Sequence, residues 1–356
     1  MQNSLAYRIF FWAHRWFGVV AGLYFVLFGI TGSYLVYESS FDKWMYPDRF
    51  VSESTADTID IPRYVATAQI GLQTDRLPTR VTLPESSSEN VNLIFNLADI
   101  GTPPRNVRVY IDPSTFAFKG AYEMLESFGV IMRTFHHDLF LGAAVGRFWM
   151  GLSGVLFMVI LLSGLWIWWP KVRFLKKSLK WPNLRSFYKG AIDLHKFFGI
   201  YSLILMIAVT FSGLYISVPG WFQFGGKPSA ARPPDITAAL PEIDFAAIQS
   251  QLANQGLLSR PLRVNYNSRD QSVTVRLGEG QPGQTYDVVS KTLTSDKPNE
   301  EGPKTFEMRR FQREVHGGDY WGSLGEILTF VSGLLPLFFW MTGCYVWWTK
   351  RRLKAA

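Results

Sequence analysis

Residues 14–34 read HRWFGVVAGLYFVLFGITGSY, and residues 195–215 read HKFFGIYSLILMIAVTFSGLY. The two stretches align without a gap, with a histidine at the head of each and a Gly-x-Tyr step at the end of each. After its histidine each stretch is apolar for about 20 residues, the length that a helix needs to cross the hydrocarbon core of a bilayer. The pair therefore predicts two membrane-spanning helices built on one pattern.

Two further apolar runs of similar length follow the first two along the chain, so that the four together cover residues 16–37, 148–169, 197–218 and 327–348. The second and fourth runs also match each other: Ser163-Gly164 aligns with Thr342-Gly343, and WIWWPK aligns with YVWWTK. A segment that spans hydrocarbon must satisfy its backbone amides internally, so each run is predicted to be a helix. The sequence predicts a membrane protein, mainly α, with four transmembrane helices.

Positive charge orients these helices. Residues 171–190 are rich in Lys and Arg and contain no acid, and the tail after the last run reads KRRLK. Basic loops remain in the cytoplasm, so both termini are expected there and the long segments 38–135 and 220–315 are expected outside. The net charge of +8 then reflects membrane topology, and no nucleic-acid partner is expected.

Both halves run in the same direction, from an in-to-out helix through an outer segment to an out-to-in helix. They form a parallel internal repeat. The predicted organisation is TM helix 1 at 5–37, an outer module at 38–135, an outer lead-in with TM helix 2 at 136–170, a basic cytoplasmic loop at 171–190, TM helix 3 at 191–219, a second outer module at 220–315, an outer lead-in with TM helix 4 at 316–349, and a cytoplasmic tail at 350–356.

The two outer segments each predict a small α+β module. The first contains a helical stretch at 61–72 followed by alternating strands, with an Asp-Pro turn at residues 112–113. The second contains a helical stretch at 245–254, again followed by alternating strands. Since the strands show one apolar face, each module is expected to pack its helix on one side of its own sheet.

The five histidines are His14, His136, His137, His195 and His316. Two-fold placement of the halves brings His14 to His195 on the inner side, and His136 or His137 to His316 on the outer side. Zinc takes three or four protein ligands, and no carboxylate or thiolate recurs beside these pairs. Haem iron needs only two axial ligands, and a helical bundle is a common place for haem. The histidines therefore predict two haem sites.

With both axial positions filled, each haem iron would carry single electrons. The absence of a CxxCH motif predicts non-covalent haem b. Gly18 and Gly199, one turn after the inner histidines, together with the nearby Gly22, would leave room for a porphyrin, although close helix packing explains such glycines equally well. The single cysteine, Cys344, allows no disulfide within the chain.

The outer ligand has two candidates, because adjacent residues on a helix point about 100° apart and only one of His136 and His137 can be axial. Counting back from the shared Ser-Gly motif favours His137. Local context favours His136, since RTFH matches REVH and places Arg133 and Arg313 three residues before the histidine. We take His136 as the ligand, with Gly142 and Gly146 bending the lead-in back towards the membrane.

Four cationic residues lie beside the predicted ligands, and each is a candidate partner for a haem propionate. Arg133 and Arg313 lie one turn before the outer histidines, and Arg15 and Lys196 directly follow the inner ones. For Arg15 and Lys196, the topology signal of basic inner loops is an equally good explanation.

The chain resembles the PepSY-associated transmembrane family. The resemblance rests on HRWFG with TGSY, HHDLFLGAAVGRFWMGLSG with SGLWIWWPK, HKFFG with SGLY, and VHGGDYWG with TGCYVWW. It also includes VYIDPSTFAFKG, which is similar to the Asp-Pro-x-Thr turn of PepSY domains. The resemblance implies two PepSY-like periplasmic modules on a multi-pass protein of the bacterial inner membrane.

Members of this family that serve siderophore uptake are iron reductases with two b haems. The resemblance thus implies a ferric-siderophore (ferrioxamine-type) reductase, with His14 and His195 holding the inner haem and His136 and His316 the outer one. The electron donor stays open between membrane quinol and a cytoplasmic reductant. The alternatives are electron transfer to another periplasmic acceptor, and a transporter or anchor without haem that carries binding modules.

Overall fold

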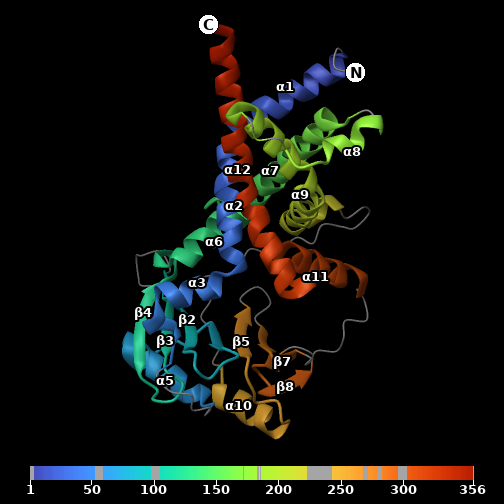
Figure 1. Ribbon diagram of the computed structural model, residues 1–356. Helices are drawn as coiled ribbons and strands as arrows, with labels where there is room; N and C mark the ends of the chain where they lie inside the picture. Colours follow the sequence, from blue (N-terminus) through green and yellow to red (C-terminus); the bar gives the residue numbers. More distant parts are fainter. Residues whose placement is uncertain are drawn as a thin grey trace. The chain divides into compact units, whose positions relative to one another are not determined.

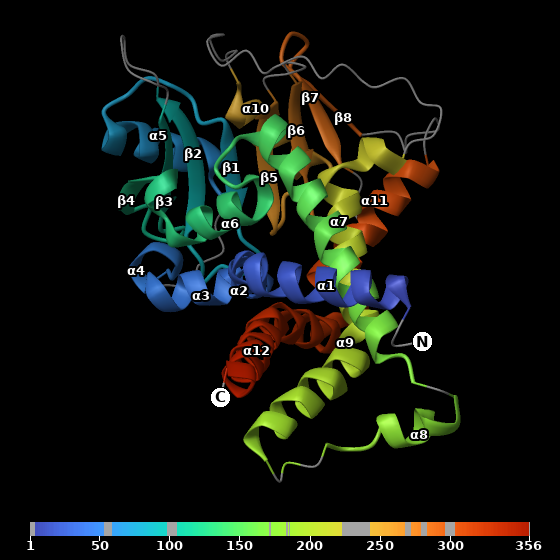
Figure 2. The same cartoon turned by 90° about the horizontal axis from the view of Figure 1, so that it is seen from above.

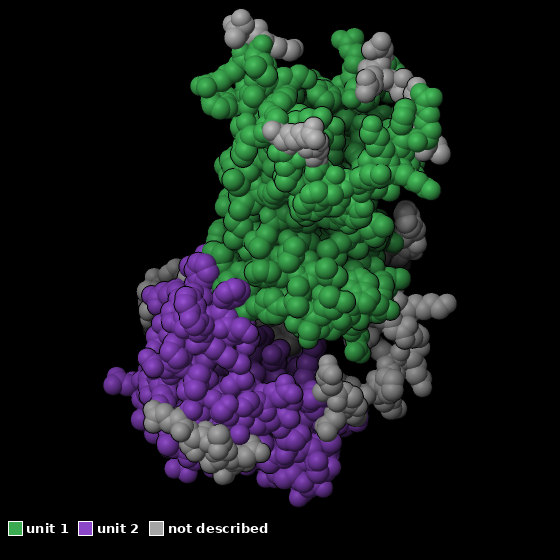
Figure 3. Space-filling model, viewed as in Figure 1, with its two compact units in different colours: residues 1–38, 132–228, 304–356 green, residues 39–131, 229–303 purple. Residues whose placement is uncertain are grey.

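The computed structural model describes residues 4–52, 59–97, 105–170, 172–182, 184, 186–222, 243–267, 272–278, 283–295 and 303–355. The chain divides into two compact units, which Figure 3 shows in different colours. We call residues 1–38, 132–228 and 304–356 the membrane unit, and residues 39–131 and 229–303 the sheet unit. Each unit is therefore assembled from both halves of the sequence.

The membrane unit is helical (Figure 1). Its main helices are α1 (Leu5–Val20), α2 (Gly22–Val36), most of α6 (Phe128–Asp138), α7 (Ala143–Trp168), α9 (Phe187–Ser217), nearly all of α11 (Pro303–Gly317) and α12 (Gly322–Ala355), with the short α8 (Leu175–Ser178) in the basic loop. Three candidate spans, at 144–168, 187–217 and 319–353, are long and apolar enough to cross a membrane, and the bent pair of α1 and α2 makes a fourth if it is counted as one span. The chain is thus a membrane protein with three to four candidate helical spans.

The first span differs from the prediction of one straight helix. It breaks at Ala21, where α1 and α2 meet at a 60° bend. The Trp340 indole packs so closely at this break that a side chain on Gly22 would collide with it, and its Nε1–H donates to the Val19 carbonyl at 3.1 Å. A kink of this size usually has a local cause, and here an inserted indole that binds a backbone carbonyl supplies it.

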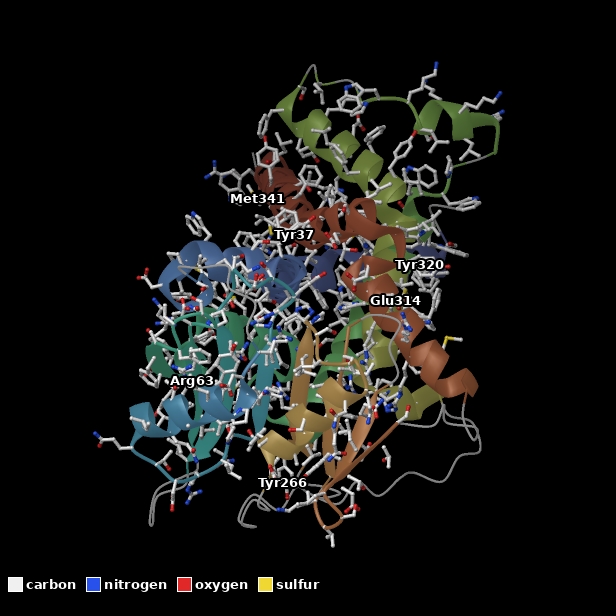
Figure 4. All side chains as sticks on the ribbon, turned by 90° about the horizontal axis from the view of Figure 1, so that it is seen from below. Tyr37, Arg63, Tyr266, Glu314, Tyr320 and Met341 are labelled. Carbon is white, nitrogen blue, oxygen red and sulfur yellow. The ribbon has the colours of Figure 1, made fainter. Side chains whose placement is uncertain are left out.

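Small residues bring the helices of the membrane unit together. A Cβ on Gly29 of α2 would collide with the Gly333 carbonyl of α12, so the two backbones are in direct contact. Ser33 donates to the Phe330 carbonyl at 2.7 Å, and the ring of Tyr37, labelled in Figure 4, packs against Phe330 at a tilt of 55°. Close approach through small residues is the usual way in which helices associate in lipid.

The sheet unit contains one antiparallel sheet of eight strands, in the order β4-β3-β2-β1-β5-β6-β7-β8 (Figure 2). The strands are β1 (Arg80–Leu83), β2 (Val91–Leu97), β3 (Arg105–Ile111), β4 (Phe118–Glu123), β5 (Leu262–Asn267), β6 (Ser272–Arg276), β7 (Gln284–Asp287) and β8 (Thr292–Ser295). The expectation of two separate modules is therefore wrong. The strands of the two outer segments join edge to edge through β1 and β5, where Val81 lies opposite Val264. The joint removes two exposed sheet edges.

One face of this sheet carries the hydrophobic core. The helices α5 (Ile61–Leu72) and α10 (Phe245–Asn254) have the bounds that the sequence predicted, and both pack on this face, with Tyr64 and Ile248 fully buried. The sheet unit also includes α3 (Glu38–Met45, except its first residue) and α4 (Pro47–Phe50). Alternation along the strands places mostly polar residues on the second face, together with the buried Ile94 and Tyr110.

The Asp-Pro turn closes the hairpin between β3 and β4. The Asp112 carboxylate accepts from the Ser114 and Thr115 amides at 2.9 and 3.0 Å, from the Ser114 hydroxyl, and from Ser52. Burial by itself raises the pKa of Asp112, but these hydrogen bonds outweigh it and hold the pKa well below its usual value. The predicted motif is therefore a turn stabilised by an ionised aspartate.

Candidate functional site

The inner histidine pair joins the first and third predicted spans. His14 lies on α1 and His195 on α9, and their ring centroids are 6.3 Å apart with the ring planes 87° from parallel. Both side chains are half-buried. The structure thus brings together the two residues that head the repeated sequence stretches.

The outer pair is formed by two lead-in helices. His136 lies on α6 and His316 on α11, with ring centroids 6.2 Å apart and planes at 41°. The ring of His137 lies 6.1 Å from that of His136, and its side chain is exposed. Of the two adjacent histidines, His136 is thus the one whose ring lies against that of His316.

Each of the four paired histidines packs on a Ser/Thr-Gly step of a neighbouring helix. The steps are Ser163-Gly164 for His14, Thr342-Gly343 for His195, Thr31-Gly32 for His136 and Ser212-Gly213 for His316. Nδ1 of each ring lies 2.8–3.3 Å from the hydroxyl, and a Cβ on the glycine would lie 2.7–3.8 Å from Cε1. The glycine thus gives the ring room, and the hydroxyl orients it. We call these four steps the histidine cradles.

The contacts in the cradles indicate which ring nitrogen carries the proton. Each cradle hydroxyl lies within hydrogen-bond distance of a carbonyl one turn earlier on its own helix, for example Thr342 on Phe338 at 2.8 Å and Ser163 on Ile160 at 2.9 Å. A hydroxyl whose proton is used in this way can only accept from the imidazole. His14 and His316 also face the carbonyls of Ile160 and Val209 at 3.0 and 2.9 Å. The contacts therefore favour Nδ1–H, which leaves the Nε2 lone pair of each ring for a metal ion.

Two of the glycines predicted to leave room do so, and one does not. A Cβ on Gly18 would meet nothing within 4 Å, and one on Gly199 would meet only Phe339, at 3.9 Å. Gly22 instead packs tightly against Trp340. Open space therefore lies one turn after each inner histidine, whereas Gly22 belongs to the helix bend.

The arginines beside the pairs have different surroundings. Arg133 forms an ion pair with Glu38, and Arg313 is exposed on α11. The Nε atom of Arg15, next to His14, is buried without a hydrogen-bond partner, while Lys196 is exposed. Among these four cations, Arg15 thus has a buried donor that would gain from an anionic partner.

The outer lead-ins end in tight turns, as the glycine positions predicted for the first of them. Helix α6 ends at Asp138 and α7 follows Gly142, whose φ is +76°. Helix α11 similarly precedes Gly318 and Gly322, with φ of +93° and +58°. Glycine tolerates these angles without the cost of a Cβ. Both turns separate an outer histidine from the span that follows it.

Sequence reasoning missed the cradle hydroxyls of Thr31, Ser163, Ser212 and Thr342. Their signal was present, because the aligned halves repeat a Ser/Thr-Gly dipeptide near the end of each span. Among the residues that the structure describes, no group of three or more His, Cys, Asp or Glu side chains is placed to hold a metal ion. The donor set at each pair is therefore two imidazoles.

Comparison with known protein families gives a match. The family model described as the PepSY-associated TM region covers residues 11–350 of this chain. No curated protein matches the sequence.

Proposed function

Since the chain belongs to the family of the PepSY-associated TM region, we propose that it is a dihaem b protein that carries electrons across the bacterial inner membrane and reduces ferric siderophores. The observation that carries the proposal is the presence of two facing histidine pairs, each with its Nε2 lone pairs available. His14 and His195 would hold the inner haem, and His136 and His316 the outer one.

The spacing of the rings supports a linear arrangement of ligands. Two imidazoles on opposite sides of one metal have centroids about 6.3 Å apart, because the metal–nitrogen bond is about 2.0–2.1 Å and the nitrogen lies about 1.1 Å from the ring centre. A tetrahedral metal would bring them to about 5 Å. The observed spacings of 6.3 and 6.2 Å would allow the two imidazoles of each pair to hold one haem iron between them.

The residues around the inner pair also fit a haem. The open space at Gly18 and Gly199 would admit the flat ring, and the buried Nε of Arg15 would gain a partner in a propionate. At the outer pair, Arg313 is exposed and Arg133 already pairs with Glu38. A propionate there would bind Arg313, or it would bind Arg133 after Arg133 releases Glu38.

Bound haem b would supply reversible one-electron transfer, since both of its axial positions would be filled by imidazole. The protein's own residues hold the four rings and fix their Nδ1 protons through the cradles. The ferric ion of a siderophore would take up one electron at the outer face and become Fe(II). The electron would come from membrane quinol or from a cytoplasmic reductant.

We also propose a membrane topology for the chain. The two halves would be a parallel repeat, with both termini in the cytoplasm and the sheet unit in the periplasm. The matched cradles support the repeat, because each half supplies one inner and one outer histidine together with two cradles.

The direct test is a haem count on the purified protein. A pyridine haemochrome assay is expected to give two b haems per chain, and His14→Ala or His195→Ala is expected to give one. Reconstituted protein, reduced from the inside, is then expected to release Fe(II) from external ferric chelates. A protein that stays colourless after expression with added haem would refute the proposal.

A further inference from the structure

A cavity of about 320 Å³ lies in the membrane unit, between α2, α7 and the turn that joins α6 to α7. Small-molecule sites in proteins are typically about 300–1,000 Å³ in volume. The walls of the cavity include Tyr24 of α2, Leu139 and Leu141 of the turn, and Trp149, Ser153 and Leu156 of α7. The cavity is therefore large enough for the head of a compact organic molecule.

The cavity opens on a surface that a bilayer would cover. Leu141 and Trp149 in its walls are 51% and 47% exposed, and Trp149 lies within the candidate span at 144–168. The walls are apolar apart from the hydroxyl groups of Tyr24 and Ser153. A ligand that enters from the bilayer thus has to be apolar over most of its surface.

The hydroxyl of Tyr24 is arranged to accept a hydrogen bond from a ligand. The oxygens of Tyr24 and Ser153 are 2.7 Å apart, and the Ser153 hydroxyl donates to the Trp149 carbonyl at 2.7 Å. Because the Ser153 proton is used there, the Tyr24 hydroxyl donates to Ser153, and the Tyr24 oxygen keeps its lone pairs as acceptors. A ligand that carries its own hydroxyl group can therefore donate to Tyr24.

Aromatic rings connect the cavity to the outer histidine pair. The ring centroid of Tyr24 lies 4.6 Å from that of Phe28, and the centroid of Phe28 lies 5.7 Å from that of His136. Both distances are typical of aromatic rings in contact. A ligand beside Tyr24 would thus be linked to His136 through a continuous path of packed rings.

The turn beside the cavity has an unusual backbone. Leu139 and Phe140 have φ of 57° and 60°, in a region that bulky residues seldom adopt. Strained positions of this kind gather at active sites and ligand sites. Leu139 is both a strained residue and a wall of the cavity.

We propose that this cavity binds the hydroquinone ring of a membrane quinol, and that the quinol is the electron donor. This role rests on the proposed function. A quinol dissolves in lipid, has a flat ring that can pack against Trp149, and carries a hydroxyl group that can donate to Tyr24. Oxidation of one quinol to quinone releases two electrons and two protons. The electrons enter beside the outer pair and reduce two ferric ions in turn, and the protons pass to water at the turn between α6 and α7.

The test measures the binding of tritiated decylubiquinol, kept reduced under argon, to the full chain in phosphatidylcholine nanodiscs. Empty nanodiscs are the blank, and saturable binding is expected. Tyr24→Phe keeps the ring and removes the acceptor oxygen, so the affinity should fall about five- to tenfold, as loss of one hydrogen bond does. Leu156→Trp fills the cavity and should abolish saturable binding.

Two matched variants control for general damage to the helices. Tyr201→Phe removes a phenol hydroxyl that donates to the Leu179 carbonyl, outside the cavity. Leu162→Trp adds an indole at an exposed position of α7 that does not line the cavity. Both variants should bind decylubiquinol like the wild type. If Leu156→Trp does not fold, Tyr24→Phe decides the outcome against Tyr201→Phe.

A lipid tail could also occupy an apolar cavity, and a competitor distinguishes the two ligands. The dimethyl ether of decylubiquinol keeps the ring and the chain but has no hydroxyl group to donate. It should compete about tenfold less well than unlabelled decylubiquinol, because it cannot donate to Tyr24. Equal competition by the ether, or wild-type affinity in Tyr24→Phe, would overturn the proposal.

The haem count separates this proposal from the proposed function. Two b haems per chain without saturable binding of decylubiquinol would overturn the quinol site and leave a cytoplasmic reductant as the donor. A protein without haem would refute the proposed function, whether or not decylubiquinol binds.

Discussion

The two histidine pairs reach nearly the same ring spacing by different routes. His14 and His195 lie within α1 and α9, helices of the first and third spans, so the helical register of these spans places them. His136 and His316 lie on separate lead-in helices, each followed by a turn with positive-φ glycine. The inner site therefore depends on span geometry, whereas the outer site depends on turns that return a helix to the bundle.

The surroundings of the pairs differ as well. Open space adjoins the inner pair at Gly18, where a Cβ would meet nothing within 4 Å. The outer pair also has an additional histidine, His137, at 6.1 Å from His136. The inner site thus has one possible pair of histidines, whereas at the outer site the orientation of the rings decides between His136 and His137.

The largest expected effect comes from replacing the outer ligand, and it tests whether His136 or His137 binds the outer haem. Under the proposed function, His136→Ala should lower the haem count from two to one and reduce ferric-chelate reduction at least about a hundredfold, because it removes an axial ligand. His137→Ala should keep both haems, since that side chain is exposed. Pyridine haemochrome and chelate-reduction assays on both variants measure this. Loss of haem from His137→Ala with retention in His136→Ala would reverse the assignment.

A smaller effect is expected from filling the space beside the inner pair. Gly18→Leu places a side chain where a Cβ meets nothing within 4 Å, so the protein without haem should fold as before. Haem binding at the inner site should weaken about tenfold or more, because the leucine occupies the space one turn from His14. Haem titration followed by absorbance measures the affinity.

Gly18→Ala is the matched control, and its single methyl group should change haem affinity little. If Gly18→Leu binds two haems with the affinity of the wild type, the open space beside the inner pair is not part of the site.

Much of this architecture could be predicted from sequence. Hydrophobic length predicted the spans, the local residue pattern predicted α5 and α10, and the alternation of apolar residues predicted the strands, because these signals are local. The bend at Ala21 could not be predicted, since it depends on Trp340 from a helix more than three hundred residues away in sequence. The joining of β1 to β5 also escaped prediction, because strand alternation does not specify the neighbour.

The candidate site, like the fold, could be predicted in part from the sequence. The repeat predicted which histidines pair, and the RTFH and REVH contexts favoured His136 over His137. The cradles were not recognised, although their Ser/Thr-Gly dipeptides are in the aligned motifs. A glycine beside a hydroxyl is common in membrane helices for packing alone, so only coordinates show that each dipeptide faces an imidazole.

The turn before the second span, at Gly142, allows a test of whether the turns after the lead-in helices position the outer histidines. Gly142 has φ +76° and ψ 160°, and Gly142→Ala should destabilise the protein by about 1 to 3 kcal/mol, the cost of a Cβ in a region that glycine alone adopts readily. Haem loss on mild heating should then affect the outer site first, because the turn positions His136. Gly220→Ala is the control, since that glycine also has open space around it but no positive φ. Equal destabilisation by both variants would contradict the role of the turn.

The smallest expected effect is on the midpoint potential of the inner haem, and it compares the hydrogen bonds of His14 and His195. Nδ1 of His195 faces the Thr342 hydroxyl at 2.8 Å, whereas Nδ1 of His14 faces both Ser163 and the Ile160 carbonyl. A hydrogen bond accepted from Nδ1–H makes an imidazole a more basic ligand, which favours the oxidised metal. Thr342→Val should therefore raise the midpoint potential of the inner haem by about 40 mV, the equivalent of about 1 kcal/mol for one electron.

Ser163→Ala should raise the same potential by less than half as much, because the Ile160 carbonyl still accepts from His14. Optical redox titration of the two variants, with the haem count as control, measures the difference. Equal shifts would mean that the carbonyl contact does not compensate for the hydroxyl, and the tautomer of His14 would then depend on Ser163 as that of His195 depends on Thr342.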